Sequence, residues 1–321
     1  MPSPDILVAG ETLIDFLPDS AGPLADVKTF SRRAGGAPAN VAVALSRLDR
    51  PPWFLTNISE DPFGDFLADG LRSDGVPDRF VTRDPDHPTT LAFVAHDADA
   101  DRSFTFYGAD SADSHLDAGV VPESVLDAVE WVCVDAPVAL AADPARSALL
   151  ALCERAADHD CRVAFDPNTR RELWPDETAL HETLDAMLAR TDVVKTSMED
   201  LDRTRFAADD PADLAANLFA AGPHTVFLTR GADGSRALAT HRAPWGAMDE
   251  AHPGYDVDAV DATGAGDAFL AGVLFGLAAD EPLDEVLGFA NAVAALTTTE
   301  PGANTALPDR ETVVDFRDRT A

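Results

Sequence analysis

The sequence predicts an α/β protein whose mostly parallel sheet is flanked by helices on both faces. Short apolar runs alternate along the chain with longer segments of helical periodicity, the order typical of repeated strand–helix–strand units. Several of these apolar runs are nearly continuous, as expected for strands that are covered on both faces. No internal repeat or low-complexity linker divides the 321 residues, so we expect one domain spanning residues 1–321.

Six apolar runs are predicted to form the strands of this sheet: Ile6–Ala9, Trp53–Asn57, Trp131–Val134, Arg162–Phe165, Val193–Thr196 and Thr225–Thr229. The segment after the second run shows how the intervening helices are recognised. Asp61 is suited to cap a helix that has Pro62 in its first turn, apolar residues follow at helical spacing, and Gly75 ends the pattern.

Two segments, about residues 13–33 and 89–107, do not follow this alternation of strands and helices. Both read as strands of alternating character, and the second contains a predicted hairpin, Leu91–Ala95 and Ser103–Phe106, around the polar turn 97–102. We expect them to form a small β-sheet that projects from the main domain. Such a sheet could close over a substrate as a lid and exclude water, or it could be an extra edge sheet without a moving role.

The composition argues against several classes of partner. The formal net charge of −33 provides no basic footprint for a nucleic acid or for an anionic membrane. Because the acidic residues are spread along the chain, we expect a solvated acidic surface suited to a high-salt cytoplasm, where screening reduces self-repulsion. No membrane-spanning or signal-like stretch is apparent, which predicts a soluble cytoplasmic protein.

Three cysteines, Cys133, Cys153 and Cys161, are present. Their odd number and the lack of a Cys-x-x-Cys spacing indicate neither a disulfide framework nor a zinc–thiolate site. We expect them to be small, buried, apolar residues.

The most informative stretch runs from Asp261 to Phe269, between a predicted extended segment, Tyr255–Val260, and a predicted apolar helix, Ala268–Ala278. Its two glycines allow backbone N–H groups to point toward one site, and the start of the helix adds unpaired N–H groups and a positive dipole end. This pattern predicts an anion site. Asp267 lies at its edge, where a carboxylate could take the proton from a hydroxyl that attacks a phosphoryl group.

A second glycine-containing run precedes the predicted helix Val41–Leu48. Gly35 and Gly36 would allow a ligand to approach the backbone, and Asn40 offers donor and acceptor groups suited to sugar hydroxyls, although a Gly-Gly pair before a helix is also typical of an ordinary turn. Asp15 lies in an otherwise apolar strand. It is either a buried carboxylate that a ligand hydroxyl could partner or an exposed position on an alternating strand.

Polar residues and glycines also follow three successive predicted strands: Asp166, Asn168 and Arg170 after the first, Lys195 to Glu199 after the second, and Thr229, Gly231 and Gly234 after the third. Open α/β sheets bind ligands beyond the carboxyl ends of their strands, so these residues are candidates for one site. Glu199 could orient the water around a magnesium ion.

Two other phosphate-binding patterns are excluded. The third glycine of a dinucleotide fingerprint that starts at Gly264 would fall on Phe269, and no acidic residue ends a following strand about 20 residues on. No Gly-Lys-Ser or Gly-Lys-Thr of a Walker loop occurs.

Taken together, the runs Gly35–Asn40 and Asp261–Phe269 resemble the two signatures of the ribokinase-like sugar kinases, the PfkB family. The resemblance extends from about Asp5 to Pro308. Within the family, three segments are similar to fructokinases: Gly10–Phe16, Pro88–Tyr107 and, most clearly, Phe165–Trp174. The resemblance implies a Rossmann-like core with a small β-sheet lid, and magnesium-dependent transfer of the γ-phosphate of ATP to a sugar hydroxyl.

The family's roles carry over to individual positions. The resemblance makes Asp267 the catalytic base and assigns the anion hole to Gly264, Ala265 and Gly266. It assigns the sugar to Asp15, Gly35, Gly36 and Asn40, together with Asp166, Asn168 and Arg170 of the fructokinase-like segment. The nucleotide pocket would include Lys195, Thr229, Gly231, Gly234 and Asn291, and Glu199 would be tied to the hydration of magnesium. Some relatives also bind K+, and the sequence leaves open whether this chain does so near Asp258–Asp261. In the family the lid often mediates dimerisation, so we expect a homodimer.

Three departures from the family pattern bear on the substrate. Fructokinases usually carry an arginine where this chain has Gly108, many members carry Asn at Thr196, and Ala262 replaces a common Thr. We expect transfer to a primary hydroxyl of fructose. The residues leave open a ketohexokinase acting at C1, a 2-keto-3-deoxygluconate kinase, a kinase for another sugar or a nucleoside, and a non-catalytic sugar-binding regulator.

Overall fold

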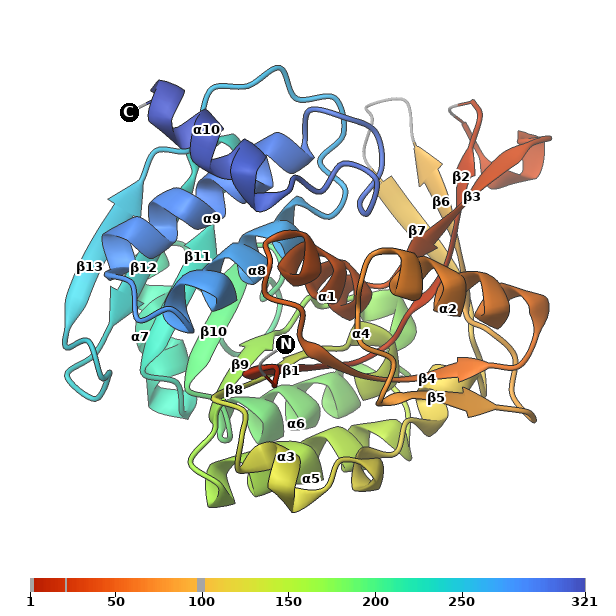
Figure 1. The fold of residues 1–321 in the computed structure, drawn as a ribbon, viewed down its shortest axis with the longest axis horizontal. Coiled ribbons are helices and arrows are strands. Elements are labelled where there is room, and N and C mark those ends of the chain that lie inside the picture. Colours follow the sequence, from red (N-terminus) through yellow and green to blue (C-terminus); the bar gives the residue numbers. More distant parts are fainter. Residues whose placement is uncertain (1–2, 21, 97–101, 321) are drawn as a thin grey trace.

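The computed structural model describes residues 3–20, 22–96 and 102–320. Its centre is a nine-stranded sheet in the order β13-β12-β11-β10-β9-β8-β1-β4-β5 (Figure 1). The strands are β1 (Ile6–Ala9), β4 (Trp53–Ser59), β5 (Val81–Asp84), β8 (Trp131–Asp135), β9 (Arg162–Asp166), β10 (Val193–Ser197), β11 (Thr225–Thr229), β12 (Ser235–Ala239) and β13 (Met248–His252).

The predicted mostly parallel sheet is confirmed. Strands β5, β4, β1, β8, β9, β10 and β11 are parallel neighbours. Strand β12 runs in the opposite direction and pairs antiparallel with both β11 and β13. All six predicted strands form, and none differs from its expected bounds by more than two residues. Strands β5, β12 and β13 were not expected. The edge strand β13 reads Met-Asp-Glu-Ala-His and is largely exposed, so it lacks the apolar run that marks a buried strand.

Helices cover both faces of the sheet. On one face lie α1 (Ala37–Arg47), α8 (Ala265–Leu277), α9 (Leu283–Thr297) and α10 (Arg310–Thr320), and on the other lie α3 (Glu123–Leu126), α4 (Pro137–Leu140), α5 (Ala145–Asp158), α6 (Glu177–Leu188) and α7 (Pro211–Ala221) (Figure 1). Strand β1 shows why two cores form. Ile6 and Val8 point into one core and Leu7 and Ala9 into the other, because successive side chains of a strand alternate between faces.

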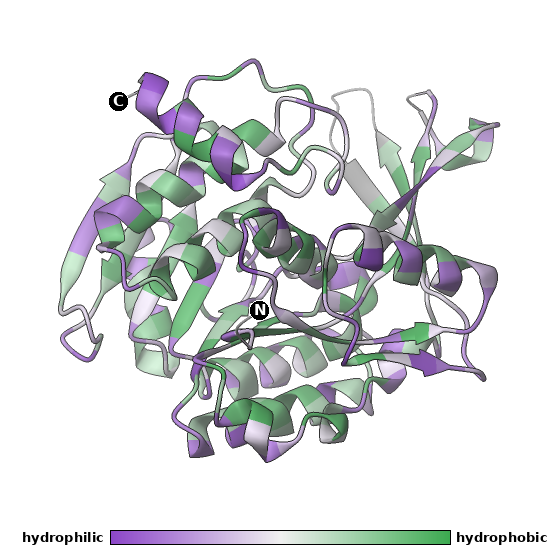
Figure 2. Ribbon diagram, viewed as in Figure 1, coloured by the Kyte–Doolittle hydropathy of each residue, from purple (hydrophilic) through white to green (hydrophobic). Residues whose placement is uncertain are grey.

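Hydropathy follows this layering. The central strands are green between the helices, whereas α10 on the outside is largely purple (Figure 2). Cys133, Cys153 and Cys161 are free and buried, as expected. Within the described residues, no helix combines the length and the apolar character that crossing a bilayer requires.

A separate four-stranded sheet, which we call the lid sheet, projects from the carboxyl-end edge of the main domain (Figure 1). Its order is β3-β2-β6-β7, formed by β2 (Leu13–Pro18), β3 (Phe30–Gly35), β6 (Leu91–His96) and β7 (Arg102–Tyr107). The predicted hairpin forms, with Leu91 opposite Tyr107, while residues 97–101 of its expected turn lie outside the described residues. The sheet is mixed, because β2 pairs with β6 in parallel.

Three helix starts position the site or the lid sheet. Helix α2 (Pro62–Ser73) starts as predicted, with the Asp61 side chain accepting hydrogen bonds from the N–H groups of Phe63 and Gly64. Helices α1 and α8 begin at Ala37 and Ala265, several residues before the expected Val41 and Ala268. Glycine precedes each of them and lets the chain turn directly into the helix.

The predicted extended segment Tyr255–Val260 lies in a loop and is not part of either sheet. The backbone N–H groups of Val260 and Asp261 both donate to the carbonyl of Thr298, so this loop is held by the end of helix α9 and not by a sheet partner.

Candidate active site

A cleft of about 370 Å³ opens between the carboxyl ends of the main strands, the starts of α1 and α8, and the lid sheet. Ten of the predicted site residues line it: Asp15, Gly36, Asn40, Asn168, Arg170, Lys195, Thr229, Gly264, Gly266 and Asp267. Residues that are up to 252 positions apart in the sequence thus meet in one place, as expected for ligand sites beyond the carboxyl ends of parallel strands.

Asp267 lies in the first turn of α8 at the floor of this cleft and is 9% exposed. One of its carboxylate oxygens, Oδ2, accepts a hydrogen bond of 2.6 Å from Asn40 Nδ2 on α1. Burial raises the pKa of Asp267, whereas the bond from Asn40 and the charges of Lys195 and Arg170 act in the opposite direction. The result is a fixed carboxylate with enhanced basicity, facing the cleft.

The start of α8 has no side-chain cap. Its N-cap residue is Gly264, whose left-handed φ of 77° suits glycine, and a Cβ there would lie 2.7 Å from that of Ala303. Within the described residues, no hydrogen bond engages the backbone N–H groups of Gly264, Gly266 or Asp267. Three free donors beside the positive end of a helix make this helix start chemically suited to an anion.

Ala265 departs from its expected place in the anion hole. Its N–H donates to the carbonyl of Ala262 at 3.2 Å, closing a turn, and Ala265 does not line the cleft. Gly266 has a further reason to be glycine, since a Cβ at this position would lie 2.9 Å from Lys195 Nζ.

Asp15 lies on β2 of the lid sheet, opposite Arg33 of β3, and its carboxyl group faces the cleft. Burial and then the charge of Asp267 raise its pKa to about 7, while Arg170 acts in the opposite direction. Asp15 is half-buried, which does not fit the alternative of an ordinary exposed strand position. Gly35 explains how the carboxyl group fits, because a Cβ on Gly35 would lie 2.0 Å from Asp15 Oδ2.

Gly36, the N-cap of α1, permits a second close approach. Its φ is 101°, and a Cβ would lie 2.8 Å from the carbonyl oxygen of Glu11. Gly35 itself does not line the cleft, so its contribution is to seat Asp15, whereas Gly36 lies at the cleft surface.

A buried charge network supports the opposite wall. Asp166 is fully buried, and its Oδ2 accepts from Lys195 Nζ at 2.6 Å. Burial raises the pKa of Asp166 to about 6, which the ammonium group of Lys195 opposes. Burial disfavours the charge of Lys195, but the carboxylates of Asp166 and Asp200 outweigh it and raise the pKa of the amine. Asp166 thus lies behind the cleft and positions Lys195 at its surface.

Asn168 and Arg170 reach the cleft from the loop after β9. Asn168 Nδ2 donates to Asp135 Oδ1 at 3.0 Å, while its backbone N–H donates to Asp166 Oδ1 at 3.0 Å. Burial raises the pKa of Asp135 well above its usual range, and its Oδ2 has no hydrogen-bond partner among the described residues. Arg170 also lines the cleft, with its guanidinium carbon 5.6 Å from the centroid of the Phe104 ring.

Of the residues predicted for the nucleotide pocket after Lys195, only one lies at the surface of the cleft. Thr229 lines the cleft, whereas Gly231, Gly234 and Asn291 do not. Asn291 is buried and donates from Nδ2 to Ser235 Oγ and to the Leu287 carbonyl, both at 2.7 Å. Gly234 is packed beside β13, where a Cβ would lie 2.1 Å from the His252 carbonyl oxygen. These two residues shape the wall behind Thr229.

Glu199 also lies outside the cleft. Its side chain is exposed, whereas the next residue, Asp200, lines the cleft and accepts hydrogen bonds at Oδ2 from the N–H (3.0 Å) and hydroxyl (2.7 Å) of Ser197. The sequence places two carboxylates side by side in this turn, and only the backbone decides which one faces inward.

Sequence reasoning missed further lining residues. Glu11 is 1% exposed, accepts hydrogen bonds of 3.2 Å from the N–H groups of Val138 and Ala139, and has a pKa that burial raises to about 8. Phe104 and Phe106 of the lid sheet also face the cleft, with ring centroids 5.9 Å apart. Phe104 and Phe106 are two residues apart on β7, so strand alternation could have predicted that both point to the same face. No local pattern singled out Glu11.

Comparisons with known proteins agree with this geometry. The pfkB family carbohydrate kinase model matches residues 3–310. The fructokinase of Klebsiella pneumoniae is 35% identical over 312 residues, which cover 95% of this chain and 97% of the relative. The fructokinase with bound ATP from Xylella fastidiosa has a TM-score of 0.86 at 30% identity, with 98% of both chains covered. A fructokinase double mutant from Vibrio cholerae, solved with fructose, ADP and potassium ion, has a TM-score of 0.85 at 29% identity, again over 98% of both chains.

Both expected signatures lie in one cleft, and the family match covers nearly the whole chain. The small lid sheet and the mostly parallel main sheet are the fold of the solved relatives. The chain therefore belongs to the pfkB family of carbohydrate kinases and is an ATP-dependent sugar kinase.

Proposed function

We propose that this kinase transfers the γ-phosphate of ATP to a primary hydroxyl of fructose. The observation that carries the proposal is the buried Asp267 carboxylate, held by Asn40 beside the uncapped N–H groups at the start of α8. The 35% identity to a fructokinase over almost the whole chain supports the choice of sugar.

In the proposed reaction, Asp267 accepts the proton of the sugar hydroxyl as its oxygen attacks the γ-phosphorus. The bond from phosphorus to the bridging oxygen of ADP breaks, and the N–H groups of Gly264, Gly266 and Asp267 stabilise the charge on the transferred group. These donors are part of a rigid helix start, so they need no rearrangement during the step. Lys195 lies beside Gly266, where its ammonium group adds positive charge on the same side.

The sugar is proposed to lie between the lid sheet and α1, against Asp15, Gly36, Asn40 and Arg170. A protonated Asp15 can donate to a hydroxyl and an ionised one can accept from it, and a pKa of about 7 makes both forms accessible near neutral pH. The lid sheet would exclude water from the phosphoryl group when it closes.

The charge of the cleft favours a neutral sugar over a sugar acid. Asp200 and Asp267 line it, together with Asp15, whose pKa of about 7 leaves it partly ionised, against Arg170 and a Lys195 already paired with Asp166. Glu11 also lines the cleft, but its pKa of about 8 leaves it largely uncharged. A carboxylate such as that of 2-keto-3-deoxygluconate would meet more acid than base here. Gly108, where fructokinases usually carry arginine, lines a neighbouring hollow with Thr90 and Ser114 and not this cleft.

Magnesium is the proposed cofactor. The donor set fits the ion, which uses one or two carboxylates, several waters and the phosphates of its nucleotide. Asp200 is the carboxylate of the 196–200 turn that faces the cleft, so it would orient the water shell, in place of the expected Glu199. When bound, magnesium neutralises phosphate charge.

A potassium ion is proposed at Asp258–Asp261, supported by the V. cholerae fructokinase structure that contains one. In this chain Asp261 holds the loop in place, because its Oδ2 accepts from the N–H of Gly302 and its Oδ1 from Thr263, both at 2.9 Å. Turnover in KCl compared with NaCl at equal ionic strength tests it, and equal rates in the two salts would contradict it.

A homodimer formed through the lid sheet is also proposed. Tyr107 on β7 is 63% exposed and packs edge-to-face on Phe93 of β6, so an aromatic surface remains open on the lid sheet. Light scattering of the wild type and of Tyr107→Glu tests this arrangement. The wild type should be a dimer that the variant disrupts, and a monomeric wild type would contradict the proposal.

A nucleoside is the second candidate substrate, because Phe104 and Phe106 give the cleft an aromatic wall on which a base could stack. Fructose is preferred because the rest of the cleft is polar.

The deciding experiment measures ADP release with ATP and magnesium in molar KCl over fructose, glucose, ribose, 2-keto-3-deoxygluconate and nucleosides. Phosphorus NMR of the product distinguishes C1 from C6. Turnover on fructose that Asp267→Asn abolishes is the expected result. Turnover on another ligand with none on fructose would overturn the choice of sugar.

A further inference from the structure

Two histidines and an aspartate meet at the junction between the main sheet and the lid sheet, away from the catalytic cleft. His87 lies on the connection that enters the lid sheet, between β5 and β6. Asp110 and His115 lie on the connection that leaves it after β7, at the short 3-10 helix Ala112–His115. Among the described residues, His87, Asp110 and His115 form the group of three potential metal ligands whose donor atoms all lie within 4.8 Å of one another.

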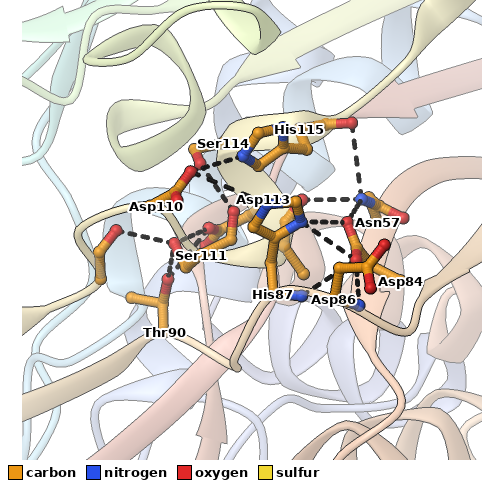
Figure 3. Close-up of polar contacts among 12 residues, drawn as sticks. Asn57, Asp84, Asp86, His87, Thr90, Asp110, Ser111, Asp113, Ser114 and His115 are labelled. Carbon is orange, nitrogen blue, oxygen red and sulfur yellow. Dashed lines mark hydrogen bonds and ion pairs between the residues drawn. The ribbon is translucent and has the colours of Figure 1, made fainter.

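The Nε2 atoms of both imidazoles face the same carboxylate. Asp110 Oδ1 lies 2.7 Å from His115 Nε2 and 3.8 Å from His87 Nε2 (Figure 3). The two rings stack with centroids 3.7 Å apart and an interplanar angle of 15°. Two nitrogens and one oxygen thus lie within 4.8 Å of one another at the edge of the stack.

His87 is held in this orientation from behind. Its Nδ1 lies 2.9 Å from Asp84 Oδ2, and Asp84 in turn accepts from the N–H groups of Asp86 (2.9 Å) and His87 (3.0 Å) and from Asn57 Nδ2 (3.2 Å). A carboxylate that accepts the Nδ1 proton leaves the Nε2 lone pair free for a metal, which is the usual arrangement behind metal-binding histidines. Asp84 is therefore a positioning residue for the Nε2 of His87.

Both connections are firmly fixed, which keeps the three side chains together. Ala112 N–H donates to the Pro88 carbonyl at 3.0 Å, and Thr90 Oγ1 donates to the buried Asp113 at 2.9 Å. Asn57 Nδ2 reaches across from β4 to the Ala112 carbonyl at 2.7 Å. These bonds join the entering and leaving segments independently of the histidines.

We propose that His87, Asp110 and His115 bind a divalent transition-metal ion of the zinc class. Two imidazoles and one carboxylate suit zinc or cobalt, whereas magnesium and calcium prefer oxygen donors. Donor atoms around tetrahedral zinc lie roughly 3.4 Å apart, so the site must contract slightly. Because the lone pairs of two nearly parallel rings do not meet at one point, the imidazoles must also turn out of the stack to bind one ion. The side chains of His87, His115 and Asp110 are 25%, 29% and 77% exposed, which leaves them room to turn. The three residues leave a fourth position open to water.

The ion would join the chain that enters the lid sheet to the chain that leaves it. Because His87 lies on one connection and Asp110 and His115 on the other, a bound metal adds a cross-link at the base of the lid sheet. This site is independent of the proposed sugar and would exist whichever substrate the kinase uses.

The test is a titration of the chelator-treated protein of 321 residues with Co²⁺, followed by visible absorbance. The buffer contains 1 M KCl and 5 mM MgCl₂, so that K+ and Mg²⁺ occupy weak acidic sites on the surface. We expect one equivalent to bind at micromolar concentration with the strong absorbance of tetrahedral cobalt, and zinc to displace it. His87→Ala and His115→Ala should abolish this signal. Asp84→Asn should weaken binding at least about tenfold, since it removes the support of a ligating histidine.

His159→Ala is the matched control, because its imidazole is similarly exposed and contacts two carboxylates, Glu123 and Asp127. It should bind cobalt as the wild type does. Asp110→Asn changes an exposed side chain and tests the site even if a histidine variant folds poorly. No saturable binding by the wild type, or unchanged binding by both Asp110→Asn and His115→Ala, would overturn the proposal.

The cross-link has its own readout in amide hydrogen exchange. Zinc at saturation should slow exchange in β6 and β7 of the wild type and have no effect in His115→Ala. Unchanged exchange in the wild type, with the metal bound, would show that the ion does not restrain the lid sheet.

Discussion

Helices α2 and α8 both begin with an aspartate nearby, but the two aspartates have opposite properties. Asp61 is the N-cap of α2, and its Oδ1 accepts from the N–H groups of Phe63 and Gly64 at 2.9 and 2.8 Å. Asp267 lies inside the first turn of α8, where Gly264 provides no cap and the carboxylate faces Asn40 instead. One helix start is satisfied by its own side chain, and the other leaves its donors open to a ligand.

The pKa values diverge for the same reason. Burial acts on both carboxyl groups, but hydrogen bonds from Thr89, Gly64 and Phe63 outweigh it and lower the pKa of Asp61. At Asp267 burial dominates and raises the pKa. The comparison teaches that the position of a carboxylate relative to the N–H groups, and not its residue type, decides whether it stabilises a helix or serves as a base.

The substitution Asp267→Asn is the strongest test of this difference between the two aspartates. The amide keeps the shape but cannot accept the proton, so we expect kcat to fall about 10²–10⁴-fold. Sugar binding, measured by calorimetry, should change little. The matched variant Asp61→Asn should keep near-normal kcat, and a normal kcat in Asp267→Asn would refute the role of the base.

Gly264→Ala should displace the open helix start. The new Cβ would lie 2.7 Å from Ala303 Cβ, and φ of 77° is strained for alanine. Because a small shift of positioned groups can cost about 10²-fold in rate, we expect a loss of that order in kcat/KM for ATP. Gly70→Ala in α2, where the new Cβ meets nothing within 4 Å, is the control that should keep its activity.

Arg170→Met should move the pH dependence of turnover. Arg170 lowers the pKa of both Asp267 and Asp15, so its removal raises both. Asp267 must be ionised to act, and the acidic limb of kcat/KM should therefore shift to higher pH. Arg171→Met, which removes a neighbouring charge paired with Glu177, should leave the limb in place. A shift to lower pH would contradict the assignment.

Asp61→Ala should cost about 1–2 kcal/mol of unfolding free energy at pH 7, as expected for a lost helix cap. Since the folded-state pKa of Asp61 is lowered, this contribution is present above the unfolded value of 3.8 and disappears as pH falls through the folded value. Urea unfolding of both proteins at neutral and acidic pH measures it. Asp69→Ala, an exposed residue of the same helix, should cost less than about 0.5 kcal/mol.

Molar KCl should stabilise the protein, because salt screens the exposed acidic groups and leaves the buried ones largely unaffected. The net charge of −33 resides mainly on the surface, where salt at about 1 M reduces the screening length to about 3 Å. We expect the melting temperature to rise by a few degrees at constant pH. A melting temperature that is insensitive to KCl would mean that surface repulsion does not limit stability.

Sequence patterns predicted the main sheet well because its strands are buried on both faces and leave continuous apolar runs. They failed at β13, whose exposed edge position imposes no apolar run, and at the starts of α1 and α8, where glycine let the helix begin early.

At the site, the two glycine-containing runs identified the cleft, because close backbone approach requires glycine at Gly36 and Gly264. Local sequence could not decide which of two neighbouring residues faces the cleft. Glu199 and Asp200 look alike in sequence, and the direction of a turn separates them. Ala265 was expected to donate to an anion, yet its N–H closes a turn with Ala262. Glu11 was missed because its partners lie 127 and 128 residues away.

The bond between Asn40 and Asp267 joins positions 227 residues apart. During synthesis Asn40 therefore leaves the ribosome 227 residues before the proposed base does. A nascent chain that lacks α8 therefore cannot perform the proposed chemistry, since it has neither the carboxylate nor the donors around it.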